Sequence, residues 1–244
     1  KADCELGKNL DKSKKLHRSG TEYALKVLKR FSEILNVSKI TNLKIIATAV
    51  LREATDTKPF IDEIEKLFKT KINILSGEEE ATCSAEGVKI GFENVDGLVA
   101  DLGGGSLELA RVENNIVTNK TSLPVGVLRL MNNPIVKKRN LAKYIKKLLR
   151  DEKWISKKKF NNLYLVGGTW RALFKLHLFQ NNHPVHIIHQ YSIDNNVLSK
   201  FVEKISSFNK SKLKTVEYIS KSRTPYLPYS CIILDEIMKV SNPK

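Results

Sequence analysis

The segment from residue 97 to 109 combines the residue types that hold a phosphate beside a metal ion. An apolar run leads to Asp101, and Glu108 lies beyond a turn. Three glycines and a hydroxyl residue form that turn: Gly103, Gly104, Gly105 and Ser106. Glycine lets an anion approach backbone amides closely, and a divalent metal ion offsets repulsion between carboxylate and phosphate. The pattern predicts a buried strand, a phosphate-binding turn and a second strand, with Asp101 and Glu108 as metal ligands.

A second glycine turn follows another short apolar run, at residues 163–166. Gly167, Gly168 and Thr169 stand between this run and a helical pattern that starts at Trp170. A strand, two glycines and a helix amino terminus make a ready phosphate site, because the first amides of the helix have no partner within it. We expect this turn to hold a neighbouring phosphate.

Each of these features has a purely structural alternative. Glycine turns are common in proteins, and Asp101 could be a strand-end carboxylate satisfied by a hydrogen bond. Glu108 could simply face solvent. Repetition of the same device along the chain favours two points of contact with phosphate over two unrelated turns.

Three histidines, His183, His186 and His189, suggest a metal site at first sight. They flank Pro184 in an extended segment and need not share a face, so ordinary packing roles are expected. Trp170 and Phe174 are expected in the core.

The bulk composition limits the class of protein. The chain has 244 residues, 41% of them hydrophobic, which supports a real core. No apolar run is long enough to span a bilayer and no signal peptide opens the chain, so no membrane partner is expected. Three scattered cysteines fit a reducing, cytoplasmic setting. The net charge of +16 favours a polyanionic partner, although a lysine-rich solvated surface is an equal alternative.

Hydrophobic periodicity predicts an α/β fold. Ser19 and Glu22 have the spacing of a capping box at the start of the first long helix. Helices are expected near 19–35, 59–68, 77–91, 140–150, 170–179, 195–206 and 226–240, and strands at 43–50, 71–75, within 97–123 and at 163–166. The two halves have separate strand clusters, so we expect the division in the helix after Gly77, with domains at 1–84 and 85–244.

Several blocks of the chain resemble, in order, the exopolyphosphatase and guanosine-pentaphosphate phosphatase family. The most specific are SGEEEA at 76–81, DLGGGSLE at 101–108, SLPVGVLRL at 122–130 and VGGTWRA at 166–172; weaker ones are 6–10, 46–54 and 227–234. Together they span nearly the whole chain.

The resemblance implies two ribonuclease-H-like domains of the actin, hexokinase and chaperone-ATPase superfamily, with the active site in the interdomain cleft. It also implies hydrolysis of the terminal phosphate of inorganic polyphosphate with Mg²⁺, or Mn²⁺ on the same ligands. Some members instead hydrolyse the 5′ phosphate of guanosine pentaphosphate, and a homodimer is plausible. Family members open with a strand and turn like Asp-Ile-Gly-Ser-Asn-Ser. This chain starts after that block, so the first domain is expected to lack its amino-terminal strands.

The resemblance also assigns roles to single residues. Glu80, the second acid of the Glu-Glu-Ala block, would act on the attacking water, and Glu79 is the neighbour most easily confused with it. Gly126 would line the cleft. Arg129 would contact the polyanion, and its structural alternative is a surface salt bridge. The structural alternative for Glu80 is that residues 78–80 only favour a helix start. The alternative for the protein is a non-catalytic polyanion-binding homologue, with nucleic acid not expected as its ligand.

Overall fold

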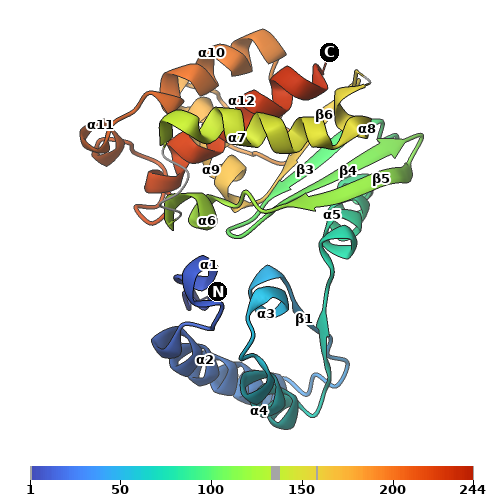
Figure 1. Ribbon diagram of the computed structural model, residues 1–244, viewed down its shortest axis with the longest axis vertical. Coiled ribbons are helices and arrows are strands. Elements are labelled where there is room, and N and C mark those ends of the chain that lie inside the picture. The colour runs from blue at the N-terminus through green and yellow to red at the C-terminus, as the bar shows by residue number, and fades with distance from the viewer. Residues whose placement is uncertain (1, 133–137, 158, 244) are drawn as a thin grey trace. The chain divides into compact units, whose positions relative to one another are not determined.

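The computed structural model describes residues 2–132, 138–157 and 159–243, which fall into two units, 1–80 and 81–244 (Figure 1). The division lies inside helix α5 (Gly77–Gly91), whose bounds match the sequence prediction. The predicted domain boundary, after residue 84, falls in the same helix.

The first unit is a small α/β structure. Strands β1 and β2 pair in parallel, with Ile45 opposite Ile72. Its elements are α1 (Leu10–Ser13), α2 (Arg18–Val37), β1 (Ile45–Ala47), α3 (Ala49–Glu53), α4 (Lys58–Phe68), β2 (Ile72–Ile74) and the first turn of α5. The core of this unit contains Ala24, Leu51, Phe60 and Ile64.

Two predictions for the first unit are wrong in detail. The strand expected over 43–50 ends at Ala47, and α3 follows directly. Helix α2 begins at Arg18, and its N-cap, His17, makes no side-chain capping bond, so the Ser19 capping box does not form. The first turn of the helix is also a site of tertiary packing. A Cβ on Gly20 would lie 2.5 Å from the Cys4 carbonyl oxygen, so the amino-terminal segment packs directly on the first turn.

The second unit is built on a four-stranded sheet of order β5-β4-β3-β6. Strands β3 (Gly97–Leu102), β4 (Leu107–Glu113) and β5 (Ile116–Leu123) form an antiparallel meander, and β6 (Leu163–Val166) pairs with β3 in parallel. The predicted β-rich region and the strand at 163–166 are confirmed.

Helices cover both faces of this sheet (Figure 1). Alternate residues of a strand point to opposite faces. Val99, Ala110 and Val112 pack against Ala81 and Ala85 of α5. The other face packs into a larger cluster that includes Leu98, Leu109, Leu141, Ile145, Leu149, Leu173, Val202 and Ile237.

Four helices of this unit were predicted: α7 (Lys138–Asp151), α9 (Gly168–Gln180), α10 (Asn195–Ser206) and α12 (Leu227–Ser241). The shorter elements are α6 (Val127–Asn132), α8 (Lys153–Ser156), α11 (Lys210–Lys214) and a 3₁₀ turn (Thr224–Tyr226), and the last three of these were not predicted. Trp170 and Phe174 belong to the core, as predicted. Across the described ranges, no helix is both long enough and apolar enough to cross a membrane.

Acidification is expected to destabilise the second unit through His177 of α9. Its ring is buried and its Nδ1 lies 2.9 Å from the Tyr191 hydroxyl. Burial, and secondarily His183, hold the pKa of His177 below its ordinary 6.5. Because the unfolded chain then binds a proton more readily, this contribution to the free energy of unfolding is complete above about pH 6.5 and is lost as the pH falls toward the folded pKa.

Urea unfolding at about pH 7.5 and pH 5.5 measures this effect. Fluorescence suits the measurement because both tryptophans, Trp154 and Trp170, lie in the second unit. His177→Gln should weaken the pH dependence, whereas replacement of the exposed His189 by Gln should not. Equal pH dependence in the parent and in His177→Gln would contradict the assignment.

Candidate functional site

Asp101 and Glu108 face each other across the β3–β4 pair. They are register partners, so their Cβ atoms lie about 4.5–5.5 Å apart on the sheet face that packs against α5. The Ser84 hydroxyl donates to Asp101 Oδ2 at 2.6 Å. The Ser122 hydroxyl donates to Glu108 Oε1 at 2.8 Å. Like charges in these positions repel, and each carboxylate is held by a serine hydroxyl.

This pair of carboxylates fits a magnesium site that is completed by substrate. Within the part of the chain that the structure describes, no group of three or more His, Cys, Asp or Glu side chains could hold a metal ion. Mg²⁺ commonly uses one or two carboxylates, keeps several waters and takes substrate phosphate oxygens as its other ligands. Asp101 and Glu108 supply that number of oxygen ligands, and Mn²⁺ accepts the same groups.

The turn between β3 and β4 directs its carbonyl groups toward α6. Gly103 O accepts from Val127 N, Gly104 O from Leu128 N, and Gly105 O from Gly126 N, at 2.9–3.2 Å. The N–H of a trans peptide points opposite to its C=O, and the described residues contain no cis peptide. The next amides, on Gly104, Gly105 and Ser106, therefore point away from α6. Successive amides that point outward form an anion-binding concavity.

The Gly103 amide has a different role from the amides that follow it. It donates to Ser106 O at 3.0 Å and closes the turn. Among the described residues, neither Gly104 N–H nor Gly105 N–H has an acceptor. The geometry thus leaves the Gly104 and Gly105 amides able to donate to an anion and gives Gly103 a structural function.

Gly126 fixes the position of this turn. A Cβ at Gly126 would collide with backbone atoms of Gly104 and Gly105. This close backbone contact explains the glycine that the sequence places before α6. Arg129 takes part through its backbone, because its N–H donates to Gly104 O at 3.1 Å.

The second glycine turn lies beside the end of β3. Gly167 has φ of 110°, a left-handed conformation that favours glycine. A Cβ at this position would lie 2.7 Å from Leu102 O and 3.0 Å from Asp101 Oδ1. Gly168 begins α9, whose N-cap makes no side-chain capping bond, and Thr169 is buried in the first turn. The amino end of α9 therefore lies next to Asp101.

Arg223 is a cation that sequence reasoning missed. A Cβ on Gly168 would collide with its guanidinium group, so this group lies over the first residue of α9. A positive charge at the positive end of a helix dipole is unfavourable without an anion. No local sequence signal links Arg223 to a glycine 55 positions earlier.

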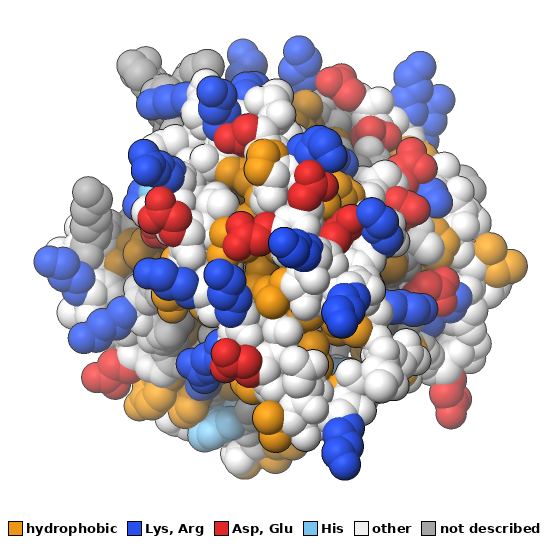
Figure 2. Space-filling view, turned by 90° about the horizontal axis from the view of Figure 1, so that it is seen from below, with side chains coloured by type: hydrophobic (Ala, Val, Ile, Leu, Met, Phe, Trp, Pro, Cys, Tyr) orange, Lys and Arg blue, Asp and Glu red, His pale blue; other side chains and the backbone are white. Residues whose placement is uncertain are grey.

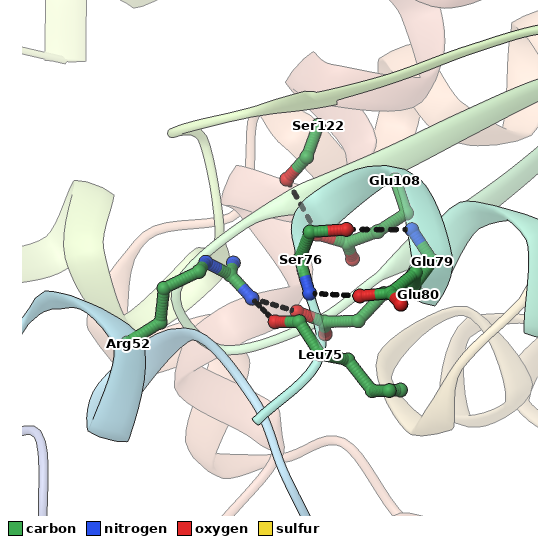
Figure 3. Close-up of polar contacts among 7 residues, drawn as sticks. All are labelled: Arg52, Leu75, Ser76, Glu79, Glu80, Glu108 and Ser122. Atoms are coloured by element: carbon green, nitrogen blue, oxygen red, sulfur yellow. Dashed lines mark hydrogen bonds and ion pairs between the residues drawn. The ribbon is translucent and has the colours of Figure 1, made fainter. Parts of the chain in front are cut away.

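Two of the three consecutive glutamates at the start of α5, Glu79 and Glu80, have separate roles (Figure 3). Glu79 Oε2 accepts from Ser76 N at 2.7 Å, and Glu79 N donates to Ser76 Oγ at 3.2 Å. This reciprocal pair is a capping box. Glu80 is oriented instead by Arg52 of α3, whose Nη1 lies 2.5 Å from Glu80 Oε1.

Arg52 positions the Glu80 carboxylate and is the second cation that sequence reasoning left unassigned. Its Nη1 also donates to the Leu75 carbonyl oxygen. Both partners are mostly buried, with side-chain exposures of 27% for Arg52 and 15% for Glu80. Glu80 and Ser84 lie four residues apart on α5, so they leave the same face of that helix.

The model of the Ppx/GppA phosphatase family matches residues 1–244. The chain belongs to this family. Its predicted resemblance is thereby confirmed.

Two curated relatives match the chain over different lengths. A guanosine-5′-triphosphate,3′-diphosphate pyrophosphatase of Aeromonas hydrophila is 35% identical over 134 residues, 54% of this chain and 27% of that protein. A bifunctional 3-dehydroquinate synthase/phosphatase of Fusobacterium nucleatum is 29% identical over 255 aligned residues, 96% of this chain and 37% of that protein. The chain thus spans well under half the length of either relative.

Solved structures support the fold. An exopolyphosphatase from Cytophaga hutchinsonii matches with a TM-score of 0.86 at 19% identity, over 98% of this chain and 80% of that chain. A Ppx/GppA family member from Aquifex aeolicus matches with a TM-score of 0.74 at 18% identity, over 99% and 80%. The predicted α/β class with two ribonuclease-H-like domains is confirmed.

A groove in the second unit of this Ppx/GppA chain reaches two residues of the candidate site, Asp101 and Gly167. It has a volume of about 1170 Å³ and is lined by Asp101 and Gly167 at the end of the sheet. Phe92, Tyr164 and His189 also line it, so this space is partly aromatic. Of the three histidines, only His189 lines the groove, and the trio forms no metal cluster among the described residues.

Replacing Gly126 by alanine is expected to displace the β3–β4 turn. The added methyl group collides with backbone, which cannot rotate away as a side chain can, so a loss of roughly 1–3 kcal/mol in stability is expected. Thermal unfolding measures this effect.

Gly87→Ala is the matched control, because a Cβ there meets nothing within 4 Å. It should stabilise α5 by roughly 0.5–1 kcal/mol. If Gly126→Ala behaved like Gly87→Ala, the close contact at the turn would be refuted.

Proposed function

We propose that this chain hydrolyses the terminal phosphoanhydride bond of inorganic polyphosphate. Glu80 orients and deprotonates the attacking water. The turn at Gly104 and Gly105 holds one phosphate, and the turn at Gly167 and Gly168 holds its neighbour. The reaction transfers a phosphoryl group to water and releases orthophosphate and a polymer shorter by one unit.

The observation that carries this proposal is the separation of Glu79 from Glu80. The capping box holds the Glu79 carboxylate against the backbone at the start of its own helix, which gives it a structural role. Glu79 accepts the Ser76 amide, whereas Glu80 is held through one oxygen by Arg52. Phosphoryl transfer depends mainly on positioning and charge, and a fixed carboxylate supplies the positioning of the water.

The charge around the two turns supports a phosphate chain as substrate. Backbone amides of Gly104 and Gly105, the uncapped amino end of α9 and the guanidinium of Arg223 are all donors or positive charges. They match the oxygens of neighbouring phosphates in chemistry. The net charge of +16 favours a ligand in which many phosphates can be neutralised at once.

Asp101 and Glu108 would hold Mg²⁺ in this proposal. The ion would supply positive charge to the phosphate oxygens, which the two carboxylates alone would repel. Ser84 and Ser122 keep the carboxylates in place through their hydroxyl groups.

Glu80→Gln is expected to lower phosphate release by about 100- to 10,000-fold, because glutamine cannot accept the proton of the water. Glu79→Gln is the matched control on the adjacent residue. It weakens the capping box, at a cost of about 1 kcal/mol, and should leave turnover within a few-fold of the parent. Near-normal turnover of Glu80→Gln at matched magnesium would remove the assignment.

A guanosine-pentaphosphate 5′-phosphatase is the second candidate function. The groove beside Asp101 favours it, because aromatic side chains such as Phe92 and Tyr164 could accommodate a base. The Aeromonas relative, whose name specifies a guanosine nucleotide substrate, also supports it.

Phosphate release from long-chain polyphosphate and from guanosine pentaphosphate, measured with one preparation, separates the two functions. We expect the higher kcat/KM for the polymer. A higher value for the nucleotide would replace the first candidate by the second. Absence of release from both, with retained binding of polyphosphate, would indicate a non-catalytic homologue.

A further inference from the structure

Helix α7 presents a row of cations to solvent. The basic stripe consists of Lys143, Lys146, Lys147 and Arg150; Lys146 is half-buried and the other three are exposed. The opposite side of the helix is anchored in the core, where Leu141, Ile145 and Leu149 are almost completely buried. The helix lies beside α12 (Figure 1), and the exposures of its side chains place the basic side toward solvent.

No acid lies between the members of the basic stripe, and the one acid of α7, Asp151, follows Arg150 at the end of the helix. Several cations elsewhere pair with acids three or four positions away: Lys8–Glu5, Arg18–Glu22, Lys58–Asp62, Lys89–Glu86 and Lys239–Asp235. Figure 2 shows the same mixing of signs on one face of the molecule, where acidic side chains stand among the basic ones. Within the described residues, no member of the basic stripe forms an ion pair.

The spacing of the basic stripe concentrates positive charge. Lys143 and Lys147, and likewise Lys146 and Arg150, lie four residues apart and are neighbours on the helix surface, where like charges repel. A bound polyanion would remove this repulsion by neutralising several cations at once. The distance along the helix from Lys143 to Arg150 is roughly 10 Å, enough for several charges of a linear polymer.

We propose that the basic stripe is an auxiliary binding surface for the polyphosphate chain, separate from the glycine turns. The identity of the polymer rests on the proposed function. The stripe lies on the helix layer that covers the sheet face opposite to Asp101 and Glu108. Only a long polyphosphate chain could contact both the basic stripe and the glycine turns. The stripe should therefore retain long polymers between successive cleavages.

Inorganic polyphosphate fits the stripe better than a single-stranded nucleic acid. Base-binding surfaces alternate cations with exposed aromatic side chains on which bases stack. The aromatic residue of α7, Tyr144, is partly buried and packs against the core. The stripe therefore offers contacts for backbone charge and none for bases.

The test removes the three exposed cations together, as Lys143→Gln, Lys147→Gln and Arg150→Gln. Glutamine preserves helix propensity, and circular dichroism checks the fold. Binding is measured in a Glu80→Gln background, so that the polymer stays intact. The triple variant should bind long-chain polyphosphate more weakly, and the slope of log K against log salt should fall by roughly 2. In the active background, KM for the long chain should rise several-fold, with release from tripolyphosphate unchanged.

A control variant carries the same charge change on three other helices: Lys26→Gln, Lys66→Gln and Lys200→Gln, all exposed. It should retain the binding and salt dependence of the parent. Parent-like binding, slope and KM in the α7 triple variant would overturn the proposal even if the enzyme is active. Tighter stripe-dependent binding of single-stranded RNA than of polyphosphate would also overturn it. Absence of phosphate release, with stripe-dependent polyphosphate binding retained, would remove the proposed function and support the binding surface.

Discussion

Direct contact between backbones at the end of β3 is the constraint on which the site of the second unit depends. Gly126 touches the turn at Gly104 and Gly105, and Gly167 touches the Leu102 carbonyl. No side chain separates these segments, so the two turns and the end of the strand form one rigid group. Glycine is needed at Gly126 and Gly167 because a Cβ atom there would lie too close to neighbouring backbone atoms. At Gly167 the positive φ also favours glycine. A methyl group at any of these contacts would move an element that is proposed to bind phosphate.

The charges of the site are ordered by the same packing. Asp101 and Glu108 lie opposite each other in a protein of net charge +16, and serine hydroxyls hold both carboxylates. Ser84 belongs to α5, which also carries Glu80 four residues earlier. One helix thus bears the carboxylate proposed for the water and a hydroxyl that holds a proposed metal ligand. The capping box at the start of α5 fixes where that helix begins. It therefore also fixes that Glu79 contacts Ser76 and that Glu80 contacts Arg52.

Much of the fold and part of the site could be predicted from local pattern. The glycine turns and the α5 helix follow from residues adjacent in sequence. Two serines, Ser19 and Ser76, have the capping-box spacing, yet the box forms only at Ser76. At the first position, the amino-terminal segment packs on the helix at Gly20, and sequence spacing cannot show such a contact. Arg52 and Arg223 were missed for a similar reason, because tertiary structure brings them to partners far along the chain.

The orientation of the peptide planes in the β3–β4 turn has a spectroscopic consequence. With their carbonyl groups turned toward α6, the planes leave the Gly104 and Gly105 amide hydrogens without an acceptor among the described residues. Glycine amides resonate in a sparsely populated region of a nitrogen–proton correlation spectrum. Binding of an anion at the turn would therefore cause downfield shifts and slower solvent exchange of the Gly104 and Gly105 amide signals. These changes could be followed even in a catalytically inactive protein.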